Sequence, residues 1–110
     1  SILDAVADDA PAVDASSTLA FSRRPFEAAA DSAIATAARA GGRAAMGHAP
    51  PDAGQTFWTD AALLAEAGTE TVVLGPVGEG LHTTEEWVDL DSVVQLAEIL
   101  ARTAHRYCTA

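Results

Sequence analysis

Lysine is absent from this chain of 110 residues, and cysteine occurs once, at Cys108. A single cysteine excludes an internal disulfide framework and is typical of a reducing compartment, so we expect a cytoplasmic protein. No apolar run approaches the roughly 20 residues that cross a bilayer. The first residues lack the basic and apolar segments of a secretory signal peptide. We therefore expect neither a leader nor a membrane partner.

Basic residues are scarce, because six arginines stand against sixteen acidic residues and give a formal net charge of −10. Nucleic-acid binding needs a basic patch that meets phosphate groups, so we expect no nucleic-acid partner. An acidic surface can keep a protein soluble in concentrated salt. The simpler interpretation is an ordinary solvated acidic face.

Aromatic residues make up only 5% of the chain, whereas 26 residues are alanine. A core of such small side chains favours helices packed closely on a little sheet. Hydrophobic periodicity and capping residues predict four helices. They cover residues 1–10, 33–40 (capped by Asp31 or Ser32 and ended by Gly41-Gly42), 60–67 (capped by Thr59 and followed by Gly68) and about 91–107.

Three strands are predicted between these helices, at residues 18–21, weakly at 43–48, and at 71–74. Since the second half alternates helix and strand, we expect an α/β fold with helices layered on a small parallel or mixed sheet. The last helix has one apolar stripe at helical spacing, which we expect to be buried. The stripe comprises Val93, Leu96, Ala97, Leu100, Ala101 and Ala104.

His82 is the main candidate for chemistry, because a glycine-rich loop presents it just after the predicted strand 71–74. Open α/β sheets build their sites at the carboxyl ends of strands, where an imidazole can bind a metal or act as a base. Glu85 and Glu86 could orient such an imidazole. The alternative is a loop histidine with a satisfied hydrogen bond. His48, His105 and Cys108 do not complete a zinc site, which needs three or four ligands.

Two further motifs have both a functional and a structural interpretation. Thr59-Asp60 is an N-cap followed by an acid that complements the helix dipole, or a helix N-terminus aimed at an anionic substrate group. Arg23-Arg24 is a clamp for a carboxylate, or a solvated pair on an edge strand. No Gly-x-Ser-x-Gly elbow, P-loop or dinucleotide fingerprint is present.

Four stretches in order resemble the C-terminal part of a family of metal-dependent peptidases and deacylases. They are residues 22–27 (SRRPFE), 58–61 (WTDA), 74–76 (LGP) and 82–89 (HTTEEWVD). The family contains acetylornithine deacetylase, succinyl-diaminopimelate desuccinylase, glutamate carboxypeptidase and aminoacylase. The resemblance implies a two-domain enzyme with a zinc-binding α/β catalytic domain and an inserted lid that helps it to dimerise. Residues 1–27 would be the C-terminal end of the lid, a helix followed by its last strand. Residues 28–110 would be the last segment of the catalytic domain.

The resemblance also implies roles for individual residues. His82 matches the family's final metal ligand, and Glu86 matches the acid four residues later that shapes the loop. Arg24 matches an arginine that contacts the substrate's carboxylate, and Thr59 and Asp60 match a pair near the substrate. The family usually has glycine before that pair, where this chain has Phe57-Trp58.

The resemblance therefore implies a hydrolase that cleaves amide bonds of N-acyl amino acids or small peptides. The complete enzyme would hold two zinc ions, with cobalt or manganese as possible substitutes. The other ligands and the general base precede the lid in the family and are absent from this chain, so we expect it to be inactive alone. We expect a homo-oligomer or pairing with the missing segment. The alternative function is a non-catalytic acidic interaction or dimerisation module.

Overall fold

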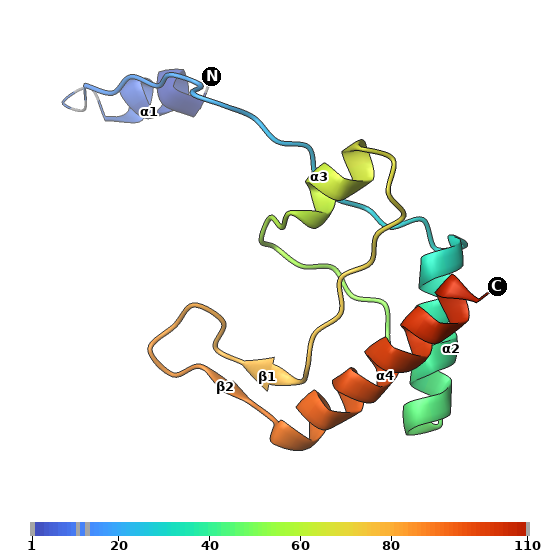
Figure 1. The fold of residues 1–110 in the computed structure, drawn as a ribbon. Coiled ribbons are helices and arrows are strands. Elements are labelled where there is room, and N and C mark those ends of the chain that lie inside the picture. Colours follow the sequence, from blue (N-terminus) through green and yellow to red (C-terminus); the bar gives the residue numbers. More distant parts are fainter. Residues whose placement is uncertain (1, 11, 13, 110) are drawn as a thin grey trace.

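The alanine-rich sequence folds mainly as helices that follow an open path (Figure 1). The structure is a computed structural model that describes residues 2–10, 12 and 14–109. Its elements are α1 (Ile2–Asp9), α2 (Ala33–Met46), α3 (Ala61–Glu66), β1 (Gly78–Glu79), β2 (Trp87–Val88) and α4 (Leu90–Cys108). Each predicted helix is present, although Ser1 lies outside the described residues. The α1 helix lies apart from the pair formed by α2 and α4.

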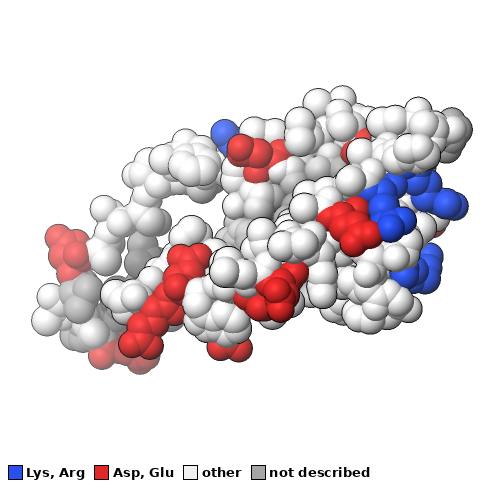
Figure 2. Space-filling model, turned by 60° about the horizontal axis from the view of Figure 1, so that its bottom comes forward, with Lys and Arg blue, Asp and Glu red and all other residues white. Residues whose placement is uncertain are grey.

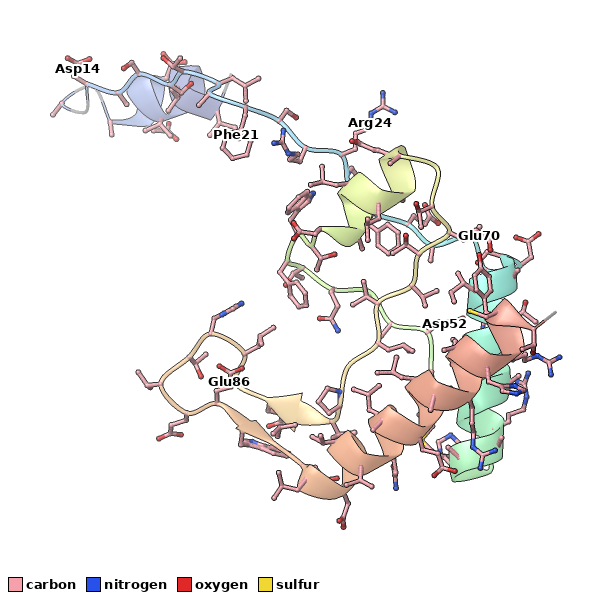
Figure 3. The ribbon with its side chains drawn as sticks, viewed as in Figure 1. Asp14, Phe21, Arg24, Asp52, Glu70 and Glu86 are labelled. Atoms are coloured by element: carbon pink, nitrogen blue, oxygen red, sulfur yellow. The ribbon has the colours of Figure 1, made fainter. Side chains whose placement is uncertain are left out.

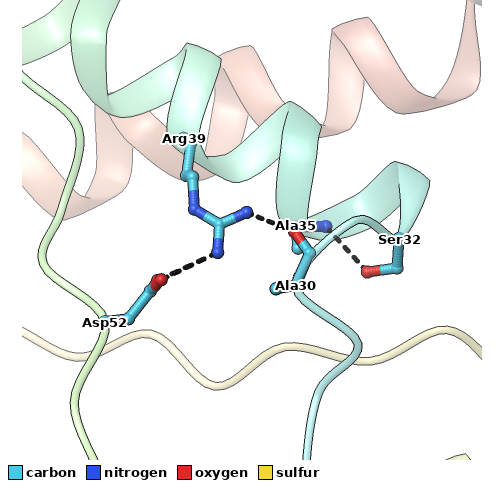
Figure 4. Close-up of polar contacts among 5 residues, drawn as sticks. All are labelled: Ala30, Ser32, Ala35, Arg39 and Asp52. Carbon is cyan, nitrogen blue, oxygen red and sulfur yellow. Dashed lines mark hydrogen bonds and ion pairs between the residues drawn. The ribbon is translucent and has the colours of Figure 1, made fainter.

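The α2 helix begins as predicted but runs further. The Ser32 side chain caps it by accepting a hydrogen bond from the Ala35 amide at 3.3 Å (Figure 4). The helix passes through Gly41-Gly42 and ends at Gly47, whose φ of 82° is left-handed. The predicted end at Gly41-Gly42 and the weak strand 43–48 are therefore wrong.

The reason is that Gly41 serves helix packing rather than helix termination. A Cβ atom at Gly41 would lie 2.8 Å from Thr103 Oγ1 and 2.9 Å from the Ile99 carbonyl oxygen of α4. Only glycine allows the two helices to approach this closely. Tertiary contact thus outweighs the low helix propensity of glycine.

The α4 helix begins at Leu90, slightly earlier than predicted, because Asp89 caps it. The Asp89 carboxylate accepts from the Ser92 amide at 3.0 Å, and the Ser92 hydroxyl donates to the Asp89 carbonyl at 2.7 Å. The Ser92 hydroxyl also accepts from the Val77 amide at 2.9 Å. The cap therefore joins the helix to the start of the β1–β2 hairpin.

The buried face of α4 differs from the predicted apolar stripe. Ser92, Ile99 and Thr103 are buried, whereas Val93 and Leu100 are 40% and 48% exposed. The hydroxyl groups tolerate burial because the helix's own carbonyls satisfy them, as in the 2.7 Å bond from Thr103 Oγ1 to the Ile99 carbonyl. The prediction that the stripe is buried is wrong for most of its members; Leu96 alone is half-buried.

The sheet in the described part of the chain is one antiparallel pair. Gly78 faces Val88 and Glu79 faces Trp87. Residues 18–21 and 71–74 are extended but form no ladder with any described residue, so neither is a strand within the described part of the chain. A strand exists only with a neighbour that receives its backbone hydrogen bonds. Helices with a small sheet are confirmed, but no parallel pairing occurs among the residues described.

The α3 helix is capped one residue later than predicted. Asp60 rather than Thr59 is the N-cap, without a side-chain capping bond, and Gly68 follows the helix with a φ of 85° as predicted. The Asp60 carbonyl accepts from the Leu63 and Leu64 amides at 3.0 and 3.2 Å. Backbone geometry therefore sets the start of this short helix.

The core is small for a chain of this length. The buried apolar residues are Ala35, Ala37, Ala38, Ala61, Ala62 and Ile99. The radius of gyration is 19.8 Å, against about 13 Å for a compact domain of ~100 residues. Among the helices described, none is long and apolar enough to cross a membrane. Much apolar surface is therefore exposed in this fold.

Glu70 joins the ends of the helix pair. One carboxylate oxygen accepts from the Ala33 amide at the start of α2 at 3.3 Å, and the other accepts from the Tyr107 hydroxyl near the end of α4 at 3.2 Å. The hydrogen bond to Glu70, together with its negative charge, raises the pKa of Tyr107 above its ordinary value of 10.0.

This contact gives a spectroscopic prediction, because Tyr107 is the only tyrosine. Absorbance titration of the phenol should give a midpoint above 10.0, and Glu70→Gln should lower it toward 10.0. Since the folded pKa is raised, the contact stabilises the fold below pH 10 and is lost as the pH rises through the folded pKa. Glu66→Gln is the matched control. Equal midpoints in the wild type and Glu70→Gln would refute the contact.

Candidate functional site

A large cavity lies beside the N-terminal half of α2. Its volume is about 820 Å³. Its walls come from residues 50–59, from the extended segment 72–74 and from α2 through Ala35, Ala38 and Arg39. Phe57 and Trp58 contribute aromatic surface and are 40% and 44% exposed. The cavity is therefore mainly apolar and open to solvent.

Arg39 is the fixed polar group of the cavity wall (Figure 4). Its guanidinium donates to both carboxylate oxygens of Asp52, at 3.1 and 2.9 Å, and to the Ala30 carbonyl at 2.6 Å. Both bonds to Asp52 come from Nη2, whereas Nη1 donates to Ala30, so the contact lacks the two parallel bonds from separate nitrogens that make the strongest arginine–carboxylate pairs. Asp52 is 78% exposed, so solvent screens the pair and its contribution to stability is small. The pair positions the loop at residues 50–52 against α2.

The predicted substrate-binding residues occupy different environments. Thr59 is half-buried and lines the cavity, whereas Asp60 is exposed at the start of α3. Arg24 is exposed and points away from the β1–β2 hairpin (Figure 3). Its neighbour Arg23 lines the cavity and lies 5.4 Å from the centre of the Phe21 ring. Of the two arginines, Arg23 is the one positioned to meet a ligand in this cavity.

His82 lies in the loop that connects β1 to β2. It is exposed and has a φ of 63°, the only non-glycine residue with positive φ in the described part of the chain. This left-handed backbone is uncommon outside glycine and costs on the order of 1 kcal/mol. The loop is held by the Thr83 amide and hydroxyl, which both donate to the Gly80 carbonyl at 2.8 Å.

Glu86 contacts the backbone of the same loop. Its carboxylate accepts from the His82 amide at 3.3 Å. The imidazole of His82 takes no part in this contact, so it stays available at the tip of the loop. The structure therefore brings His82 and Glu86 together through the backbone.

The described residues do not by themselves form a metal site. No three side chains among their histidines, cysteines, aspartates and glutamates lie close enough together to hold a metal ion. His82 offers one nitrogen donor, and zinc in proteins needs at least three protein ligands. His105 and Cys108 share the exposed end of α4 without a third donor. A metal thus does not fit this chain alone.

The two candidate regions also lie apart. Neither His82 nor Glu86 lines the cavity that contains Thr59, and Figure 3 shows Glu86 and Arg24 on opposite sides of the molecule. The sequence pointed to Thr59 but not to the roles of Arg39 and Asp52. Their pairing depends on how the loop after α2 folds back, and no local pattern indicates a contact between residues 13 positions apart.

Comparison with known proteins identifies one family. The model of peptidase family M20/M25/M40 matches residues 11–106. No solved structure matches the chain.

Proposed function

Because the chain belongs to peptidase family M20/M25/M40, we propose that it forms the C-terminal part of a metal-dependent hydrolase. The proposed reaction is the cleavage of amide bonds in N-acyl amino acids or small peptides. The proposed metal is zinc, two ions in the complete enzyme, with cobalt or manganese as substitutes. The proposed location is the cytoplasm.

The observation that carries this proposal is the geometry of His82. The left-handed φ of His82 lies at the third position of the turn that the Thr83 amide closes on the Gly80 carbonyl, and the exposed imidazole gains no burial from it. Such outliers concentrate at sites where a side chain must point in one direction. We assign His82 as one metal ligand and Glu86 as the residue that holds its loop.

The proposed substrate contacts are the residues expected from the sequence, with Arg23 added. Thr59 and Asp60 stay as proposed substrate neighbours, since Thr59 lines the cavity. Arg24 stays the proposed ligand for a substrate carboxylate, and Arg23 is a second candidate because it lines the cavity directly. The bulky Phe57-Trp58 pair would narrow the space available to the acyl group.

The remaining metal ligands and the general base would come from a segment outside this chain. Two features support such a partner. The backbone of residues 72–76 makes no hydrogen bond to any described residue, and Val72 and Leu74 are only half-buried beside the cavity. An unpaired extended segment accepts another strand readily. We propose that residues 71–74 pair there in a parallel or mixed sheet, with residues 1–27 belonging to a separate lid.

This proposal predicts that the chain alone is inactive. Incubation of the chain with N-acyl amino acids and zinc should release amino acid no faster than buffer without protein does. The reason is that one imidazole binds zinc too weakly to retain it. The measurement is amino-acid release at saturating substrate, with dialysis to count bound zinc. The result that would contradict the proposal is zinc-dependent turnover by the purified chain that His82→Ala abolishes.

The alternative function is a non-catalytic interaction module. The same unpaired segment at residues 72–76 favours it, since a strand edge can recruit a partner without any metal. The two functions differ in what happens after partner binding. The module predicts a complex without hydrolytic activity, whereas the hydrolase part predicts activity that depends on His82.

A further inference from the structure

Arg39 joins the two loops that line the cavity, and among the described residues no other side chain forms hydrogen bonds to both. Residues 25–30 form one wall and residues 50–59 form another. Nη1 donates to the Ala30 carbonyl of the first wall at 2.6 Å, and Nη2 donates to the Asp52 carboxylate of the second wall at 3.1 and 2.9 Å (Figure 4). One guanidinium group therefore connects both loops to the α2 helix.

The second loop has few other anchors. Pro50 packs against α2 where the loop begins. Within the described part of the chain, the contact between Asp52 and Arg39 is the only hydrogen-bonded contact that residues 50–58 make. Trp58 lies at the far end of this loop and lines the cavity, with 44% of its surface exposed. The Arg39 contact is therefore the polar contact that holds this wall beside the cavity.

The shape of the guanidinium group suits a contact with two partners. It is planar and presents its donors in a fixed fork, whereas the ammonium group of a lysine is a compact point charge. The Arg39 side chain is 27% exposed, so it is more buried than that of Asp52, which is 78% exposed. Its bond to the uncharged Ala30 carbonyl depends on direction and distance rather than on opposite charge.

Attraction between charges is the alternative reason for the contact. The chain has a net charge of −10, and Figure 2 shows acidic side chains beside the arginines that gather at one end of the molecule. If charge alone held the loop, lysine would replace Arg39 without effect. The fork and the charge therefore predict different results for the same substitution.

We propose that Arg39 is a positioning residue of the proposed substrate site. It holds the wall that follows Arg23 and the wall that ends at Thr59 together across the cavity. This role depends on the proposed function, which places the substrate in the cavity. Because both terminal nitrogens of Arg39 are bonded to the protein, its loss should weaken substrate binding without changing the chemical step. KM should then rise while kcat stays the same.

Acrylamide quenching of Trp58 fluorescence in the whole chain tests the positioning. A Trp87→Phe background leaves Trp58 as the only tryptophan. Arg39→Lys and, separately, Asp52→Ala should raise the quenching constant toward that of N-acetyltryptophanamide, because the loop loses its contact with α2. Arg43→Lys is the matched control, since Arg43 is exposed on the same helix and its side chain makes no hydrogen bond to a described residue.

The quenching result has two outcomes that would overturn the proposal. One is an Arg39→Lys variant that is quenched like Arg43→Lys, which would show that charge alone makes the contact. The other is an Asp52→Ala variant with unchanged quenching, which would show that the loop is held elsewhere. Far-ultraviolet circular dichroism should be the same for all variants.

Steady-state hydrolysis of N-acyl amino acids tests the effect on substrate. The polypeptide used also carries the remaining metal ligands. Arg39→Lys should raise KM by roughly 5–10-fold, the factor that one or two modest polar contacts provide, with kcat unchanged. An unchanged KM, with or without a fall in kcat, would overturn the proposal, since loss of folded enzyme lowers kcat alone. If the unaltered polypeptide showed no hydrolysis, the proposed function would be refuted instead, and quenching would decide the role of Arg39.

Discussion

Replacing Gly41 with valine should destabilise the chain by about 2–3 kcal/mol, because overpacking a tight contact costs roughly 1–3 kcal/mol and a branched side chain is among the worst fits. A Cβ atom at this position would lie 2.9 Å from the Ile99 carbonyl oxygen, which belongs to the backbone of α4 and cannot rotate away. Chemical denaturation followed by circular dichroism measures the change. The expected result is a lower midpoint with loss of helix from α2 and α4 together.

The matched control is Gly54→Val. Nothing lies within 4 Å of a Cβ atom at Gly54, so this substitution should leave the midpoint within experimental error. Similar midpoints for both variants would mean that α2 and α4 do not pack through Gly41. The helix pair would then not be the centre of the fold.

The second large effect concerns His82 in a polypeptide that also carries the remaining metal ligands. His82→Ala should reduce zinc-dependent hydrolysis by more than about a hundredfold, because a metal centre contributes several kcal/mol to such reactions. Glu86→Gln should weaken activity by roughly 10–100-fold, as for residues that orient a ligand. Steady-state hydrolysis of N-acyl amino acids measures both effects.

Two controls separate ligation from folding. Glu85→Gln removes a neighbouring acid whose side chain makes no hydrogen bond to any described residue, so activity should be unchanged. His82→Gly removes the imidazole but relieves the left-handed backbone, which should stabilise the loop by about 1 kcal/mol while activity is lost. An active His82→Gly variant would show that this imidazole is not a ligand.

The helices could be predicted from local sequence because short polar side chains cap their N-termini. Ser32 caps α2 as expected, and Asp89 caps α4 within two residues of the expected start. Gly68 follows α3 with the left-handed φ that a helix end favours. Each of these features depends on residues that are close in sequence.

The structural predictions that were wrong depend on contacts between segments that are far apart in the sequence. Gly41-Gly42 looked like a helix end, but Gly41 is needed where α2 meets α4. Residues 71–74 have the composition of a strand, yet no described strand lies beside them. The apolar stripe predicted for α4 is mostly exposed, because the contact with α2 is made at Ile99 and Thr103 instead.

The candidate site was predictable only where it depends on residues that are close in sequence. The loop at His82 is local, and the sequence indicated both His82 and Glu86, whose backbone contact the structure contains. The cavity at Thr59 depends on loops that fold back over α2, so Arg39 and Asp52 gave no pattern to detect. The assignment of His82 as a ligand and Arg24 as a carboxylate contact stays a prediction.

X-ray absorption at the zinc edge of the metal-loaded, ligand-complete polypeptide tests the assignment of His82 most directly. The wild type should show imidazole nitrogen at about 2.0–2.1 Å from zinc. His82→Ala should lose one imidazole from the fitted ligand set, whereas Glu85→Gln should leave the spectrum unchanged. An unchanged imidazole count in His82→Ala would contradict the proposal that this loop delivers a metal ligand.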